Sequence, residues 1–311
     1  MTGAAPIGQN VLVFGASGTI GAAVVKRLAA DGHRVTGIYR TAPGQPIQST
    51  QTRLCDITDP AAIARDAFTH TPDIVISCLA SRTGAPKDAW AIDYQANADI
   101  LKAAKAAGAR HFILLSAICV QKPLLAFQHA KLAFEKELRE SGLTYSIVRP
   151  TAFFKSLSGQ VDRVRKGKAF LLFGDGQLTR CKPISDGDLA RFISQCIDDR
   201  TRHNQVLPIG GPGPAITPLE QGEELFELTG QTPRFRRVPV GLFTAMAGVL
   251  GIVGRVWTRA GNAAEYLRIA RYYATQSMLV LDTETGQYTE DQTPEFGTET
   301  LFDHYRELLK D

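Results

Sequence analysis

The sequence of 311 residues lacks the features of a secreted or metal-binding chain. Its five cysteines are odd in number and lie far apart, with no CxxC or Cys/His spacing, so neither a disulfide framework nor a zinc site is predicted. The segment MTGAAPIGQN contains no basic residue and precedes a short apolar run, unlike a signal peptide. We expect reduced thiols, no metal site and a cytoplasmic protein.

Long apolar runs and strong charge patches are also missing. The uncharged run 238–254 contains Pro239 and four glycines and is shorter than the ~20 residues that cross a bilayer. It predicts a buried helix, with contact to a membrane surface as the alternative. The net charge of +4 is dispersed, and the basic runs 163–168 and 234–237 are short and lack interleaved aromatic residues, so nucleic acid is not an expected partner.

Short apolar runs alternate with amphipathic helical patterns over the first two thirds of the chain. This alternation is typical of a doubly wound parallel α/β sheet, a Rossmann domain. Strands are predicted at residues 10–14, 33–40, 53–55, 73–77, 111–116, 145–149 and 205–209, and helices at 22–32, 60–68, 94–107, 131–141 and 186–196.

The repeat is lost in two other parts of the chain. We predict a cofactor-binding domain over residues 10–152, to which residues 184–210 return. A smaller, mainly C-terminal substrate lobe is predicted over residues 153–183 and 211–311. These patterns leave the oligomeric state open.

A glycine-rich turn joins the first strand to the first helix. Glycines there permit a tight turn and a close approach of the backbone to a diphosphate. The helix N-terminus adds unpaired N–H groups that favour phosphate. The pattern predicts a dinucleotide site, with a merely structural turn as the alternative, at Gly15, Ala16, Ser17, Gly18, Thr19, Ile20 and Gly21.

The end of the second strand indicates which nicotinamide cofactor is used. It reads Tyr39-Arg40-Thr41 and lacks the carboxylate that binds the ribose 2′-hydroxyl of NAD. Arg40 is therefore a candidate ligand for a 2′-phosphate, which predicts NADPH; a solvated arginine is the alternative. Asp56 is placed either at the adenine edge or as a helix N-cap in the segment DITDP.

The spacing GxxGxxG and the segments after it resemble the extended and atypical short-chain dehydrogenase/reductases. A closer resemblance, from about residue 11 to the C-terminus, is to the 8-vinyl reductases of 3,8-divinyl chlorophyllide. It is carried by SCLASRTGAPKDAW (77–90), IDYQAN (92–97), HFILLSAICVQKPLLAFQHAKLAFE (111–135), YSIVRPTAFFKSLSGQV (145–161), VLPIGGPGPAITPLEQGE (206–223), RYYATQSMLVLD (271–282) and TPEFGTETLFDHY (293–305).

The resemblance implies NADPH-dependent reduction of the 8-vinyl group of divinyl chlorophyllide or protochlorophyllide, a magnesium tetrapyrrole, in chlorophyll and bacteriochlorophyll synthesis. The superfamily's Tyr-x-x-x-Lys pair is incomplete, because Lys131 is present but Phe127 stands where the tyrosine would be. Loss of the phenol argues against alcohol chemistry. Vinyl reduction does not require it, since hydride addition to the terminal vinyl carbon leaves a carbanion that the macrocycle delocalises and that water or a side chain can protonate.

Two residues are candidate catalytic residues on this reading. Lys131 would bind the nicotinamide ribose, as the resemblance suggests, and could relay the proton; a surface lysine is the alternative. Ser116 would lie beside the nicotinamide at the carboxyl edge of the sheet, unless it is a capping serine. The resemblance places the nicotinamide half of the cofactor, mainly through backbone contacts, at Cys78, Leu79, Ala80 and Pro150.

The candidate substrate residues are aromatic or cationic. Phe153 and Phe154 would stack on the tetrapyrrole, with a core position as the alternative. A cation would bind its propionate, and a histidine could approach the magnesium, although single residues of these types are more often solvated or structural. The candidates of these kinds are Arg82, His129, Lys155, Arg180 and Lys182.

Two further functions are compatible with a lost tyrosine. The chain could be a redox-sensing regulator that binds NADP(H), or an assembly subunit stabilised by the cofactor. Both alternatives predict cofactor binding without turnover.

Overall fold

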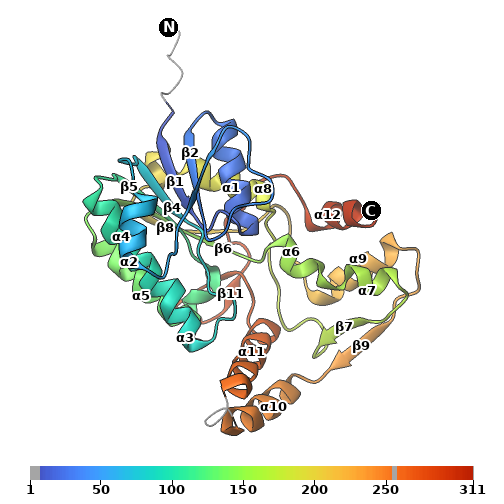
Figure 1. The fold of residues 1–311 in the computed structure, drawn as a ribbon. Coiled ribbons are helices and arrows are strands. Elements are labelled where there is room, and N and C mark those ends of the chain that lie inside the picture. The colour runs from blue at the N-terminus through green and yellow to red at the C-terminus, as the bar shows by residue number, and fades with distance from the viewer. Residues whose placement is uncertain (1–7, 254–257, 311) are drawn as a thin grey trace.

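The computed structural model describes residues 8–253 and 258–310. Within these residues, seven strands form one parallel sheet with the order β3-β2-β1-β4-β5-β6-β8 (Figure 1). This confirms the predicted doubly wound α/β sheet. The strands are β1 (Asn10–Phe14), β2 (Arg34–Tyr39), β3 (Gln51–Leu54), β4 (Ile74–Ser77), β5 (His111–Leu115), β6 (Thr144–Pro150) and β8 (Gln205–Ile209).

The central strands are apolar because helices cover both faces of the sheet. Every residue of β4 and β5 is buried, as a parallel sheet requires. On one face pack α1 (Thr19–Ala30) and α8 (Asp186–Gln195), with Val24 and Leu28 in one core cluster with Ile193. On the other face lie α2 (Pro60–Ala62), η1 (Ile63–Ala67), α4 (Asn97–Ala106) and α5 (Ala126–Glu140).

Helix α5 begins five residues before its predicted start at 131. Sequence reasoning missed the first turn because PLLAF contains no Ser, Thr, Asp or Asn as an N-cap. The structure shows that Gln128 caps the helix from inside, since its Oε1 accepts from the backbone N–H groups of Leu124 at 2.8 Å and Leu125 at 3.0 Å. The extra turn carries Phe127 and Gln128 into the interior.

A π-helical segment, η2 (Trp90–Ala96), follows the short helix α3 (Pro86–Ala89) and leads into α4. Asn97 fixes it to the end of β4, because its Oδ1 accepts from Ser77 Oγ at 2.5 Å and its Nδ2 donates to the Asp93 carbonyl at 3.2 Å. Wide helical turns of this kind are frequent at functional sites. Here the wide turn buries Asp93 below the carboxyl edge of the sheet.

The residues beyond the sheet build a second core around a small parallel ribbon (Figure 1). The ribbon pairs β7 (Phe170–Phe173) with β9 (Phe235–Val238), and Tyr305, Phe226 and Phe170 fill the core. The other elements beyond the sheet are α6 (Phe154–Leu157), η4 (Ser158–Gln160), α7 (Val161–Arg165), α9 (Pro218–Leu228), β10 (Val280–Leu281), β11 (Tyr288–Thr289) and α12 (Leu301–Leu308). The short helix η5 (Arg200–Arg202) instead joins α8 to β8.

Helices α10 (Val240–Val253) and α11 (Thr258–Thr275) pack against each other beside this ribbon (Figure 1). The prediction of a buried helix at 238–254 is wrong for Leu242 and Met246, which are 50% and 45% exposed, because α10 lies outside the main cores. Residue 254 lies outside the described residues. No helix in the described part of the chain has both the length and the apolar character that a bilayer span needs.

Candidate cofactor and substrate site

The glycine turn after β1 has the geometry of a phosphate cradle. Gly15 has φ +76°, and a Cβ there would lie 2.8 Å from the Cys78 carbonyl. A Cβ on Gly21 would lie 2.1 Å from the carbonyl oxygen of Gly15. Both glycines are therefore required for the close packing of α1 against the ends of β1 and β4. Of the other predicted residues, Ala16 and Ile20 are buried against the sheet.

The outer side of the turn is open toward the N-terminus of α1. Ser17, Gly18 and Thr19 are exposed, and the N-cap Gly18 provides no side-chain hydrogen bond. Free N–H groups and the helix dipole then favour a diphosphate at this position. Lys155, predicted to bind a propionate, places its Nζ 2.9 Å from Thr19 Oγ1, beside the glycine turn.

Arg40 and Asp56 lie at the carboxyl ends of neighbouring strands. Arg40 is exposed after β2 and makes no ion pair with the described residues, so its guanidinium is free to bind a 2′-phosphate. Asp56 is within electrostatic reach of Arg40 and accepts from Thr58 N at 2.9 Å and Thr58 Oγ1 at 2.7 Å. These hydrogen bonds lower the pKa of Asp56. The helix N-cap in this segment is Asp59.

The segment after β4 adjoins the glycine turn. The Cys78 N–H donates to the Phe14 carbonyl at 3.0 Å, and burial raises the pKa of the Cys78 thiol to about 12, so the thiol is neutral. Leu79 is buried and Ala80 is exposed. Pro150 ends β6 two strands further along the same edge. The predicted nicotinamide contacts therefore lie at the carboxyl edge of the sheet, where ligands bind in open α/β folds.

Lys131 is buried and paired with a residue that sequence reasoning missed. Its Nζ lies 2.8 Å from Asp93 Oδ1, with the two side chains 10% and 0% exposed. The Ser81 N–H also donates to Asp93 Oδ1, at 3.3 Å, while Asp93 Oδ2 is buried without a hydrogen-bond partner among the described residues. A surface role for Lys131 is thereby ruled out. The only sequence signal for Asp93 was its place in the segment IDYQAN.

The Ser116 hydroxyl points into a buried network. Its Oγ donates to Glu135 Oε1 at 2.5 Å, and Glu135 forms an ion pair with Arg149. The Ser116 N–H donates to the Val148 carbonyl at 2.8 Å. The hydroxyl proton is thus held by a carboxylate, and the structure gives Ser116 a role in joining β5, α5 and β6.

Phe127, at the position of the missing phenol, lies under α11. It shares a core cluster with Cys119 and Tyr272, and both its ring and the Ile269 side chain border Gly84. Helix α11 therefore covers the end of the site beside Lys131. The segment 271–282, which includes the end of α11, carries part of the family resemblance, but nothing in its residues predicts a site role.

The predicted substrate residues are not all brought together. Phe154 is 4% exposed in the core of the β7–β9 part, and Phe153 packs half-buried against the sheet cluster. Lys182 is buried and its Nζ contacts Glu295 Oε1 at 2.5 Å, so its charge is already neutralised.

The remaining cations lie on the surface. Arg180 pairs with Glu290 at 3.6 Å, whereas Arg82 is exposed and makes no hydrogen bond or ion pair with the described residues. His129 is exposed on α5, roughly 200° around the helix from Lys131, so the structure does not join the two. Arg82 is the better candidate for a propionate.

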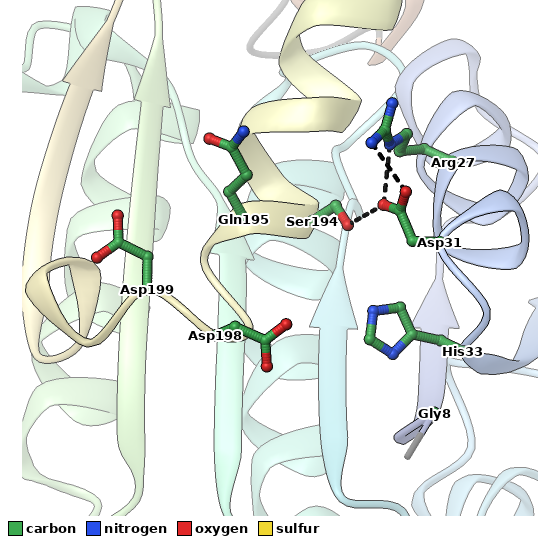
Figure 2. A pocket seen from close by; sticks show the side chains of 8 residues that line it. All are labelled: Gly8, Arg27, Asp31, His33, Ser194, Gln195, Asp198 and Asp199. Atoms are coloured by element: carbon green, nitrogen blue, oxygen red, sulfur yellow. Dashed lines mark hydrogen bonds and ion pairs between the residues drawn. The ribbon is translucent and has the colours of Figure 1, made fainter. Parts of the chain in front are cut away.

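Two cavities of about 300 and 280 Å³ lie away from this edge. The larger, shown in Figure 2, lies near the C-terminal ends of α1 and α8, where Ser194 Oγ donates to Asp31 Oδ2 at 2.6 Å. The smaller is bordered by the first residues of β1, β2 and β3. Since the glycine turn is at the opposite end of α1, neither cavity is the predicted cofactor site.

Comparisons with known proteins agree with this geometry. The model of an NAD(P)H-binding family matches residues 15–200. The chain is 49% identical to the chloroplastic divinyl chlorophyllide a 8-vinyl-reductase of Cucumis sativus, covering 98% of this chain and 77% of that protein. The Zea mays protein of the same name is 48% identical, over 97% of this chain and 80% of its own length. The chain belongs to the divinyl chlorophyllide a 8-vinyl-reductase family.

The similarity of this vinyl-reductase family member to a solved structure extends beyond the sheet. An NADPH-dependent quinone oxidoreductase from Escherichia coli, complexed with NADPH, is similar with a TM-score of 0.73 at 19% identity. The similarity covers 96% of this chain and 99% of that one. The arrangement of the sheet and of the elements beyond it is therefore shared.

Proposed function

We propose that this protein reduces the 8-vinyl group of 3,8-divinyl chlorophyllide a to an ethyl group with NADPH. The observation that carries the proposal is the 49% identity to a vinyl reductase over 98% of the chain. The Phe127 position supports it, because an enzyme without the phenol beside Lys131 is poorly suited to alcohol or carbonyl chemistry.

The residues at the carboxyl edge fit a dinucleotide. A Cβ at Gly21 would clash with the turn, and the uncapped N-terminus of α1 is free for a diphosphate, with Lys155 beside it. Arg40 would bind the 2′-phosphate, and the backbone of residues 78–80 and Pro150 would border the nicotinamide. When bound, the cofactor supplies a hydride to the terminal vinyl carbon.

Lys131 would act at the nicotinamide ribose. Asp93 fixes the position of the Lys131 ammonium, because the ion pair is buried and the Ser81 N–H donates to the Asp93 carboxylate. A buried, oriented ammonium is suited to a single binding geometry. The Glu135–Arg149 pair, joined by Ser116, fixes α5 against β5 and β6, so the position of Lys131 is set by two buried networks.

The pigment would bind between the sheet edge and the elements that follow it. Helix α11 would exclude water from the vinyl carbon, and Arg82 would bind a propionate carboxylate.

The exposed side chains of Leu242 and Met246 on α10 follow the exposed Arg236 and Arg237, a combination that supports contact with an anionic membrane surface. Co-sedimentation with anionic vesicles, absent with neutral vesicles, tests that contact.

The proposed activity is tested by incubating the protein anaerobically with divinyl chlorophyllide a and NADPH and separating the pigments. An 8-ethyl product that requires NADPH supports the proposal. Unchanged pigment despite measured NADPH binding would favour a sensor or assembly role.

A further inference from the structure

Reduction of a vinyl group needs a proton as well as a hydride, and the usual phenol is absent at position 127. The two candidate catalytic side chains are already engaged. Lys131 is paired with Asp93, and the Ser116 hydroxyl donates to Glu135. The proton must therefore come from water or from another side chain.

Helix α11 brings two consecutive tyrosines to this place. Tyr272 is 4% exposed, and its hydroxyl lies 2.9 Å from the Cys119 carbonyl and 3.1 Å from the Lys122 carbonyl. Both carbonyls belong to the segment that follows β5. Tyr272 thereby anchors α11 to the carboxyl edge of the sheet and fixes the backbone that carries Tyr273.

The hydroxyl of Tyr273 contacts the same segment but makes no strong hydrogen bond there. It is 3.9 Å from Cys119 Sγ, a weak partner, and the residue is 46% exposed. The rings of Tyr272 and Tyr273 meet edge to face, at 5.7 Å and 85°, which holds the second ring in one orientation.

The surroundings of Tyr273 belong to the proposed nicotinamide site. Cys119 is close enough to Lys131 for the ammonium to act on the pKa of its thiol. Ile269, one helical turn before Tyr273, reaches Gly84 beside the ring of Phe127. Helix α11 thus crosses the position of the missing phenol and presents another phenol next to it.

We propose that Tyr273 donates the proton in vinyl reduction. The inference rests on the proposed function. Two electrons and one hydrogen reach the terminal vinyl carbon as hydride from NADPH, which becomes NADP⁺. The Tyr273 O–H bond breaks, its proton forms the new C–H bond at the carbon attached to the ring, and the phenolate is reprotonated by water through its exposed side.

The protonation states agree with this role. Desolvation of the hydroxyl beside Cys119 raises the pKa of Tyr273 well above its ordinary value even though the residue as a whole is 46% exposed, so the phenol is protonated throughout the neutral range. Cys119 is the nearest competing donor. It is 2% exposed, and burial raises the pKa of its thiol, so it is a buried neutral group with no open path to the pigment.

The test compares Tyr273→Phe with Tyr266→Phe, a matched control on the same helix whose side chain is 70% exposed. Single-turnover formation of the 8-ethyl pigment is measured at saturating NADPH, together with the Kd for NADPH, the Kd for the pigment and the unfolding midpoint. We expect Tyr273→Phe to slow the chemical step roughly 10²-fold or more, as removal of a general acid does. Both Kd values and the midpoint should stay near those of the wild type, and Tyr266→Phe should react at the wild-type rate.

The competing donors give different results. A Tyr273→Phe rate close to that of the wild type assigns the proton to water and overturns the proposal. A slow Cys119→Ala variant beside a fast Tyr273→Phe variant assigns it to the thiol and also overturns it. If Tyr273→Phe loses pigment affinity in proportion to rate, the residue only binds. A wild-type protein that binds NADPH but forms no ethyl pigment contradicts the proposed function itself, before any variant is compared.

Discussion

Asp93 and Lys131 form a charged pair in the interior. Removing one partner of such a pair costs more folding stability than replacing both by apolar residues. Removing one side chain leaves an uncompensated buried charge, which costs about 3–5 kcal/mol. We expect Asp93→Leu and Lys131→Met each to lower the free energy of unfolding by that order. The double variant should be more stable than the sum of the two losses predicts.

Urea unfolding of the four proteins in this cycle measures the coupling. If the losses in unfolding free energy of the two single variants add up to that of the double variant, the 2.8 Å ion pair contributes no coupling energy in solution, which would contradict this prediction. NADPH affinity of the double variant then reports whether Lys131 also contacts the cofactor.

Arg40 is expected to select the phosphorylated cofactor. Because its guanidinium is exposed and has no ion pair among the described residues, Arg40→Ala should leave the fold intact. It should weaken NADPH binding roughly 10- to 100-fold, the range for a lost charge-assisted contact, and leave NADH binding unchanged. Arg34→Ala, at the other end of β2, is the control. Equal losses for NADH and NADPH would contradict the assignment.

Single residues differ in how far the sequence predicts them. The glycine turn is readable because backbone geometry demands glycine, and Phe127 is readable because its distance from Lys131 is local. Asp93 and Tyr273 are not, because their contacts with Lys131 and Cys119 join residues 38 or more positions apart. The same limit applies to the partners of Lys155, Lys182 and Phe154. The type of a residue near a strand end does not predict which distant residue it contacts.

At the scale of elements, the packing of α1 against β1 depends on Gly21. A methyl group there would meet the Gly15 carbonyl at 2.1 Å, and backbone cannot move away as a side chain can. We expect Gly21→Ala to lower the free energy of unfolding and to weaken NADPH binding at least tenfold. Gly159→Ala is the matched control, because nothing lies within 4 Å of its added Cβ. Unchanged NADPH affinity in Gly21→Ala, measured by fluorescence titration, would contradict the phosphate cradle.

The seven strands of the parallel sheet were predicted to within two residues, because buried parallel strands are continuous apolar runs with turn residues at their ends. The short strands β7, β9, β10 and β11 were not predicted. The start of α5 was missed because a glutamine inside the helix replaces the usual cap. The burial of α10 was mispredicted because an uncharged segment fits an interior and an exposed face equally well.

At the scale of the whole molecule, the proposed binding sites put cofactor and pigment on opposite sides of the reacting atoms. The glycine turn and Arg40 would hold the cofactor at the sheet, and α11, which packs against Phe127, would cover the pigment. Such an arrangement supports direct transfer between two bound molecules in one orientation. In this arrangement, hydride would pass directly from NADPH to the terminal vinyl carbon.

Direct hydride transfer is tested with NADPH in which both hydrogens on C4 of the nicotinamide are replaced by deuterium. After anaerobic turnover with divinyl chlorophyllide a, the 8-ethyl product is analysed by NMR and mass spectrometry. The account predicts one deuterium in the methyl group of the new ethyl side chain, and a deuterium in the methylene group only when the solvent is D₂O. An ethyl product whose methyl group carries no cofactor deuterium would contradict it.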